Sequence, residues 1–161
     1  MDSAIQNLLV QLDQAFDRRS WHGTNLRGSL RGVSLREAAW RAAPRRHNIW
    51  ELAVHAAYWK YAVRRRLTGE GRGSFPLDGS NWFDRPEKAT RAAWHADLAL
   101  LGEQHRLLRQ AVSSLDGAEL FKPAGGGRAS ASVRVFDLIA GVIAHDVYHA
   151  GQIQLLKRLM R

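Results

Sequence analysis

Apolar residues recur every three or four positions over four long stretches of the chain, which is the spacing of an amphipathic helix. Two connections rich in glycine and turn formers, residues 69–85 and 116–131, separate the last three stretches. Connections of this length carry the chain back along a bundle, so that consecutive helices can run parallel. The pattern predicts one all-α domain over residues 1–161, a four-helix bundle in up-down-down-up order. Its helices cover residues 3–18, about 48–68, 84–115, and from Ser130 or Ser132 to the end.

Capping residues predict where the helices begin and end. Most of the predicted caps combine a small polar side chain with a Glu or Gln three positions later. A cap at Ser34 adds a short helix that Pro44 ends, and the stretch from Gly69 to Gly73 ends the second long helix. The predicted N-terminal caps are Ser3 with Gln6, Ser34 with Glu37, Asn48 with Glu51, Asp84 with Glu87, and Ser130 or Ser132.

The last predicted helix carries two histidines on its apolar face. His145 and His149 are four residues apart, so both imidazoles leave the same side of the helix, about one turn apart. Valine and leucine share this face before and after them, so both histidines are expected inside the bundle. Two buried neutral imidazoles need partners at both ring nitrogens. Backbone groups, water or one divalent metal ion can supply these partners.

A third histidine lies on the buried side of the second long helix. His55 stands at the edge of an apolar stripe, between Leu52 and Trp59. One histidine from one helix and two from another make an open three-nitrogen metal site, with positions left for water or substrate. His105 lies inside the stripe of the third helix and is the rival ligand.

Two segments resemble the signatures of the DinB/YfiT-like superfamily, which is distinct from the DNA polymerase that shares the first name. They are Asn48-Ile49-Trp50-Glu51-Leu52-x-x-His55 with Trp59 four residues on, and His145-Asp146-x-x-His149-x-Gly151-Gln152. The Trp21-His22-Gly23 segment, the approach from Arg45 to Trp50 and the Trp82…Ala93-Trp94 region also fit, so the resemblance covers nearly the whole chain.

The resemblance implies a four-helix bundle in which three histidines hold one divalent metal ion, and here these are His55, His145 and His149. Nickel or zinc is expected, because imidazole ligands suit both. His105 does not match the family pattern, so we interpret it as a hydrogen-bonded core or interface histidine. His47 and His95 are interpreted as surface or cap residues. The resemblance also implies metal-dependent hydrolases and transferases that act with low-molecular-weight thiols and are often dimeric.

Aromatic and polar residues near the signatures are candidates for supporting roles. The resemblance places Trp21 and His22 at the mouth of the metal pocket, where His22 would be an acid–base group; alternatively, Trp21 covers the bundle end. Trp59 lies one turn from His55 and would line the pocket. For Glu51, a role as helix cap is an equally good explanation, and for Asp146 the alternative is a salt bridge. The candidates for hydrogen bonds to the metal ligands are Glu51, Asp146 and Gln152.

Composition narrows the classes of partner. The formal charge of +9 and the pI near 11.0 are typical of nucleic-acid binding. The basic residues are scattered, however, and Arg64 to Arg66 end a helix, where cations complement its dipole. Arg45 and Arg46 precede a helix and have no such explanation. Nucleic acid is therefore the least favoured partner, and the three glycines from Gly125 do not make a phosphate loop.

The absence of cysteine limits the chemistry further. Disulfides and a cysteine nucleophile are excluded, so a metal must use histidine, carboxylate or water. No run approaches the roughly 18 apolar residues of a membrane span, and no charged-then-apolar leader opens the chain. The expectation is a cytoplasmic protein without membrane contact. Apolar residues beyond a single stripe, such as Leu9 beside Leu8 and Leu100 beside Leu101, predict a homodimer.

The resemblance, together with the three-histidine site, implies a metal-dependent transferase or hydrolase that acts on a small molecule, with a thiol as candidate co-substrate. A metal-bound thiolate or hydroxide would be the nucleophile, since no protein side chain is convincing in that role. The alternative is a non-enzymatic, stress-associated dimer whose metal is structural or senses a signal. Water or substrate as the fourth ligand indicates an enzyme, whereas a fourth protein side chain indicates a structural site.

Overall fold

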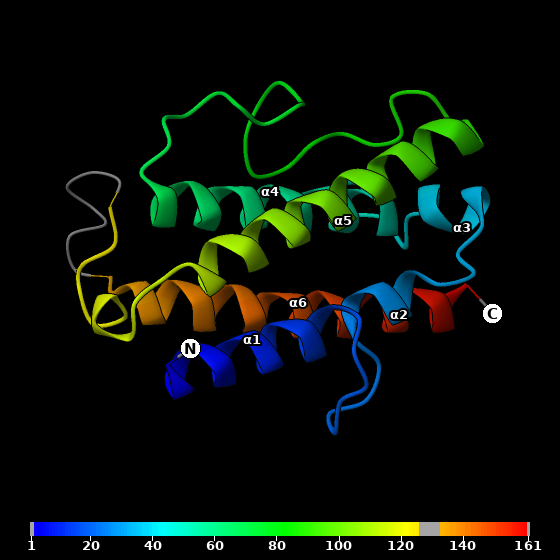
Figure 1. Cartoon of the computed structure of the whole chain (residues 1–161). Helices are drawn as coiled ribbons and strands as arrows, with labels where there is room; N and C mark the ends of the chain where they lie inside the picture. The colour runs from blue at the N-terminus through cyan, green and yellow to red at the C-terminus, as the bar shows by residue number, and fades with distance from the viewer. Residues whose placement is uncertain (1, 126–132, 161) are drawn as a thin grey trace.

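The computed structural model describes residues 2–125 and 133–160, and Figure 1 shows that these residues form helices joined by loops. The described part of the chain contains no β-strand, so the all-α prediction is confirmed. The helices are α1 (Ser3–Phe16), α2 (Leu26–Leu30), α3 (Leu35–Ala39), α4 (Ile49–Thr68), α5 (Arg91–Ser113), a 3-10 turn (Gly117–Glu119) and α6 (Val135–Leu159).

The long helices pack around a common interior. Helix α4 packs against α5 and α6, while α1 packs against the same two helices and α2 continues along α6. In Figure 1, α1 and α6 run from left to right, and α4 and α5 run in the opposite direction. No helix in the described ranges is both long enough and apolar enough to span a bilayer.

A polar layer divides the buried interior into two apolar clusters. On α4, the buried residues of the first cluster end at Ala57, and those of the second begin at Val63. On α5, the first cluster ends at Leu101 and the second begins at Leu108. Buried polar side chains occupy the level between the clusters on three helices. We refer to this set as the polar layer; its members are Lys60 on α4, Gln104 and His105 on α5, and Asp146 and His149 on α6.

Local capping signals account for α3 and α4. The side chains of Ser34 and Asn48 each accept a hydrogen bond from the amide three residues on, and Glu37 and Glu51 complete the two capping boxes. Gly69 follows α4 with a φ of 73°, a left-handed conformation that glycine adopts without strain. These two caps and the end of α4 are confirmed as predicted.

The first helix begins at Ser3, as predicted, but the residue predicted to cap it is wrong. Asp2 is the N-cap, because its carboxylate accepts hydrogen bonds from the amides of Ala4 and Ile5, and Ser3 is already helical. The helix ends at Phe16, before the predicted residue 18. A capping carboxylate also interacts with the helix dipole, which favours Asp2 over a serine hydroxyl.

The predicted start of the third long helix at Asp84 is also wrong. Helix α5 begins at Arg91, where Thr90 caps the amide of Ala93. The residues before it extend the loop instead, because tertiary contacts hold them against α4. The backbone amide of Arg85 donates to Glu51, and its carbonyl accepts from the side chain of Asn48. These bonds use the backbone groups that a helix starting at Asp84 would need.

Three shorter features also differ from the prediction. Helix α2 was not predicted, although Asn25 caps it by accepting from the amide of Gly28. Helix α3 ends at Ala39, several residues before Pro44, since Trp40 adopts an extended conformation. Helix α6 begins after Arg134, which serves as its N-cap. The predicted caps Ser130 and Ser132 lie outside the described residues, as does most of the glycine run.

Candidate metal centre

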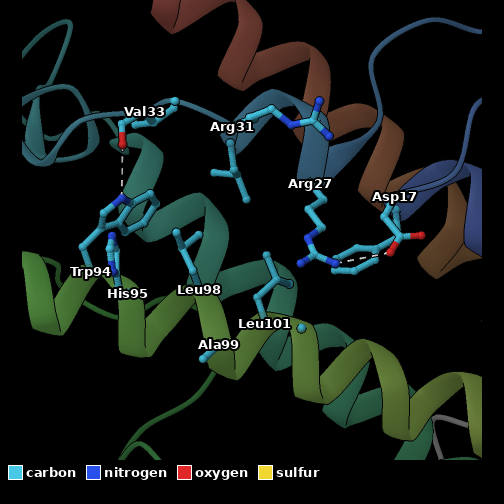
Figure 2. A pocket seen from close by; sticks show the side chains of 14 residues that line it. Asp17, Arg27, Arg31, Val33, Trp94, His95, Leu98, Ala99 and Leu101 are labelled. Atoms are coloured by element: carbon cyan, nitrogen blue, oxygen red, sulfur yellow. Dashed lines mark hydrogen bonds and ion pairs between the residues drawn. The ribbon is translucent and has the colours of Figure 1, made fainter.

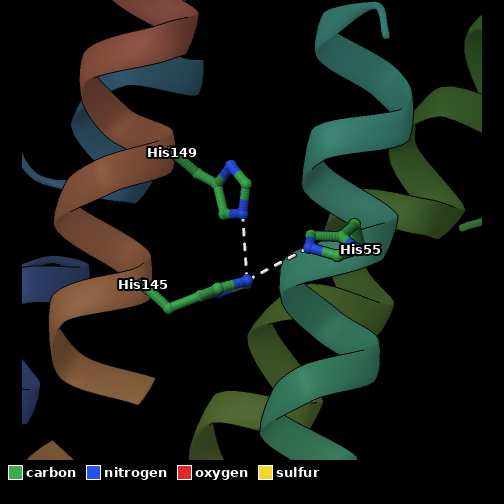
Figure 3. Close-up of side chains that lie close together, drawn as sticks. All are labelled: His55, His145 and His149. Carbon is green, nitrogen blue, oxygen red and sulfur yellow. Dashed lines mark hydrogen bonds between the residues drawn. The ribbon is translucent and has the colours of Figure 1, made fainter. Parts of the chain in front are cut away.

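Three imidazoles converge between α4 and α6 (Figure 3). Nε2 of His145 lies 3.1 Å from Nε2 of His55 and 3.0 Å from Nε2 of His149. His55 and His149 are 5 % and 3 % exposed, whereas His145 is partly open to solvent. The structure therefore brings together the three histidines that the sequence singled out, with one nitrogen of each ring facing a common point.

Hydrogen bonds at the far side of two rings determine which nitrogen carries the proton. Nδ1 of His55 lies 2.7 Å from the backbone carbonyl oxygen of Asn81, an acceptor, so Nδ1 is the donor. Nδ1 of His149 donates in the same way to Oε1 of Gln152 at 2.6 Å. The Gln152 amide is oriented by its own NH₂ group, which donates to the Tyr148 hydroxyl. Both rings consequently present an Nε2 lone pair to the centre.

The three Nε2 atoms cannot satisfy one another. His145 can offer at most one Nε2 proton, and it faces two lone pairs. Two imidazole nitrogens bound to one zinc ion at about 2.1 Å and a tetrahedral angle lie about 3.4 Å apart. The observed separations are only a few tenths of an ångström shorter. The donor set therefore fits one divalent cation, and it does so through small rotations of side chains.

Burial keeps the three rings neutral. It lowers the pKa of His55 to about 4 and the pKa of His145 to about 3, and in His145 the neighbouring His149 adds to the shift. Burial also lowers the pKa of His149. Only a neutral imidazole has a lone pair for a metal, so these rings need not lose a proton at pH 7 to bind one.

The loop between α4 and α5 closes one side of the centre. The Trp82 indole stacks on His55 with ring centroids 3.7 Å apart, and His47 stacks on its other face at 3.5 Å. Asn81 has a φ of 64°, and its side chain accepts a hydrogen bond from Trp59. Sequence reasoning missed Asn81 and Trp82 as parts of the site and read His47 as a surface or cap residue. Asparagine adopts positive φ more readily than most residues, so Asn81 could have been predicted as a tight turn in this loop.

The three residues predicted to hydrogen-bond the metal ligands, Glu51, Asp146 and Gln152, differ in the contacts that they make. Gln152 bonds His149, as just described, whereas Glu51 contacts none of the three histidines in the cluster. Burial alone would raise the pKa of Glu51, but hydrogen bonds from Arg41, the Arg85 amide and His47 together lower it. Glu51 therefore ties the loop to α4, in addition to its capping role, and within the described part of the chain no hydrogen bond joins it to His55, His145 or His149.

Asp146 points away from the cluster and forms a buried ion pair with Lys60. Both side chains are completely buried, and the Lys60 ammonium also lies 4.9 Å from the centre of the Phe16 ring. Burial raises the pKa of Asp146, and the charge of Lys60 opposes that rise. Of the two roles considered for Asp146, the structure thus shows the salt bridge and not the hydrogen bond to a clustered histidine. Lys60 was missed, although a lysine between Trp59 and Tyr61 in an apolar helix was a visible signal.

The structure does not bring Trp21 and His22 to the cluster. Trp21 is fully exposed, and its loop leaves the molecule on the side away from α4 (Figure 1). Among the described residues, no hydrogen bond or ring contact joins either side chain to the three histidines. Tyr148 is beside the cluster instead, with its ring 5.2 Å from that of His149. Its position one residue before His149 had not been used as a signal.

His105 is remote from the three nitrogen atoms and belongs to the polar layer. Its ring stacks on Phe16 with centroids 3.8 Å apart, and burial lowers its pKa to about 3. Its Nε2 lies 3.9 Å from a carboxylate oxygen of Asp13. This is the environment of a core histidine, but its buried Nδ1 has no hydrogen-bond partner among the described residues, so the predicted hydrogen bond is not seen.

A hollow of about 720 Å³ lies away from the centre, between α2 and α5 (Figure 2). Leu98 and Leu101 form part of its wall, and Arg27 reaches across its edge to Asp17 at 3.4 Å. None of the three clustered histidines lines it. The histidine cluster, between α4 and α6, is therefore a separate feature.

The fold and the centre together define a class: a helical protein with a buried three-histidine cluster able to bind a divalent metal ion. The sequence matches the DinB superfamily over residues 18–153, so the chain belongs to that superfamily. The resemblance predicted from the histidine signatures is thus confirmed. The comparison with curated proteins finds no match.

Proposed function

We propose that the protein is a metal-dependent transferase or hydrolase that acts on a small molecule, with a thiol as co-substrate. His55, His145 and His149 would hold one nickel or zinc ion. The observation that carries the proposal is the convergence of three neutral Nε2 atoms, two of them with lone pairs fixed by hydrogen bonds on the opposite side. When bound, such an ion polarises a carbonyl group or lowers the pKa of a bound water or thiol.

The chain's own residues supply orientation and shielding. Asn81 and Gln152 keep the protons of His55 and His149 on Nδ1, which preserves the ligand nitrogens. Trp59 and Trp82 cover His55 and exclude water from that side. The Tyr148 hydroxyl stands at the open side, where it can hold a proton beside a substrate.

The number of protein ligands favours catalysis over a structural role. Within residues 2–125 and 133–160, no fourth histidine or carboxylate joins the cluster. Structural zinc sites normally have four protein ligands, whereas catalytic sites keep one position for water or substrate. The alternative, a non-enzymatic metal-binding module, is favoured by the lack of a carboxylate base beside the histidines.

A thiol titration distinguishes the two functions. In cobalt-loaded protein, a thiol that binds a catalytic ion should change the visible cobalt spectrum, because sulfur then enters the coordination sphere. The Trp21→Ala variant should respond like the wild type, since Trp21 is far from the cluster. A spectrum that no thiol, carboxylate or amide changes, in a protein whose melting temperature collapses on metal removal, would favour the structural alternative.

We further infer a single four-helix bundle domain in up-down-down-up order. The helix directions in Figure 1 and the packing of α1, α4, α5 and α6 support this order. The loop after α4 leads back along the molecule to α5, which runs in the same direction as α4.

We also propose a homodimer, in which exposed leucines of α6 contact the partner. Leu8, Leu9 and Leu101 are buried within the chain and offer no surface to a partner, whereas Leu100 is only partly buried. Leu155 and Leu159 of α6 are 57 % and 58 % exposed and lie one turn apart on the same side. Sedimentation of the wild type should show a dimer, and Leu155→Glu should shift it toward the monomer. A wild type that sediments only at 18.1 kDa at micromolar concentration would contradict the proposal.

A further inference from the structure

The C-terminal turns of α4 carry a run of arginines that the metal centre does not use. Arg64 donates to Glu70 at 2.6 Å and is therefore paired. Arg65, Arg66 and the loop residue Arg72 have no carboxylate within ion-pair distance among the described residues. The residues outside that description, 1, 126–132 and 161, include no Asp or Glu side chain that could pair with them. These cations are thus available to an anion from outside the chain.

The three unpaired arginines line a hollow of about 310 Å³ between the end of α4 and the loop that follows it. Tyr58 and Phe75 give it aromatic walls, and Asp78 brings one carboxylate to its lining. The lining therefore carries an excess of positive charge. In addition, Nε of Arg66 is buried and has no hydrogen-bond partner in the described part of the chain. A buried unpaired donor is costly, and a bound oxyanion would remove that cost.

The hollow adjoins the metal centre through Trp59. Trp59 lines the hollow, and its ring centroid lies 6.3 Å from that of His55 and 6.2 Å from that of His145. Ser80 also lines the hollow, one residue before Asn81, whose carbonyl orients His55. Arg66 lies eleven positions after His55 on α4, which is about 16.5 Å along a helix. A small molecule of that length can reach from one site to the other.

We propose that this arginine hollow binds the anionic end, a carboxylate or a phosphate, of the small molecule on which the metal centre acts. The inference rests on the proposed function and narrows its substrate to an elongated anionic molecule. Guanidinium groups bind both anions through paired N–H donors, and the aromatic walls suit an apolar or planar segment between the two ends. The position at the C-terminus of α4 explains why several cations tolerate one another there, since the helix dipole stabilises them.

Calorimetric titration of the full-length protein with inorganic phosphate and, separately, with succinate tests the hollow without reference to the reaction. The Arg66→Gln/Arg72→Gln variant should lose at least tenfold in affinity for the preferred anion, while its metal content and helicity stay unchanged. The Arg19→Gln/Arg36→Gln variant has the same charge change at exposed positions and should bind like the wild type. The ratio of the two wild-type affinities separates a phosphate site from a carboxylate site. Equal affinity in the wild type and the Arg66→Gln/Arg72→Gln variant overturns the proposal.

A second titration links the hollow to the metal centre. In cobalt-loaded protein, glutathione carries carboxylates far from its sulfur, whereas cysteamine carries none. Arg66→Gln/Arg72→Gln should weaken the spectral response to glutathione at least tenfold and leave the response to cysteamine unchanged. An equal loss for both thiols overturns the proposed role of the hollow. The two proposals can also fail separately. If phosphate or succinate binding depends on the arginines but no thiol changes the cobalt spectrum, the proposed function is refuted while the anion site is supported.

Discussion

Removal of two of the three clustered histidines should abolish metal binding. Purified His145→Ala/His149→Ala protein should retain no measurable divalent ion, and the single His145→Ala change should weaken binding at least tenfold. The reason is geometric: α6 supplies two of the three nitrogens, and His55 alone is an ordinary single imidazole. Elemental analysis and competition with a chromophoric chelator would measure occupancy and affinity.

The matched control for this experiment is His105→Gln. It removes a histidine of similar burial to His55 and His149 that lies outside the three-histidine cluster and is stacked on Phe16. Its metal content should equal that of the wild type. Full occupancy in the His145→Ala/His149→Ala variant would refute the site assignment, and elemental analysis of the wild type would decide between nickel and zinc.

Loss of one partner of the buried Lys60–Asp146 pair should destabilise the protein by about 3–5 kcal/mol, because the remaining charge would be buried without its counter-ion. Lys60→Met is the sharper variant, since it keeps the length of the side chain. The double variant Lys60→Met/Asp146→Leu should recover most of the loss, because it leaves no buried charge. Urea unfolding of metal-free protein would measure the free energies without a contribution from the ion.

An exposed pair provides the control for charge and composition. Arg106 and Glu103 are joined on the surface of α5, with about half of each side chain exposed. Arg106→Met should therefore cost less than about 1 kcal/mol. A cost of Lys60→Met as small as this, or a double variant no more stable than the single one, would show that the pair does not carry the expected energy.

The sequence predicted the histidine cluster because the information about its members is local. The spacing of His145 and His149 determines that both face one side of a helix, and the apolar residues around them determine that this side is buried. The position of His55 on a second buried face required only the same periodicity. Helix existence, the caps of α3 and α4, and the family followed from the same kind of short-range signal.

The parts of the site that the sequence did not predict depend on contacts between distant segments. Asn81 lies 26 positions from His55, in a loop without hydrophobic periodicity, so nothing local indicates that its carbonyl reaches the ring. The prediction that the third long helix starts at Asp84 was wrong for a related reason. Local signals at Asp84 favoured a helix, but Arg85 is held by Glu51 and also lies 3.0 Å from the carboxylate of Asp97. Tertiary contacts overrode the local preference.

The polar layer also restricts how α4 and α6 can slide along each other. A shift of α6 by one turn, about 5.4 Å, would separate Asp146 from Lys60 and leave the buried ammonium without its counter-ion. The same shift would move His145 away from His55, because both contacts join the same two helices. One axial alignment therefore satisfies both contacts, and the ion pair favours it before any metal binds. If the cluster binds a metal as proposed, its affinity should consequently depend on Lys60 and Asp146, which hold the three histidines in register in advance.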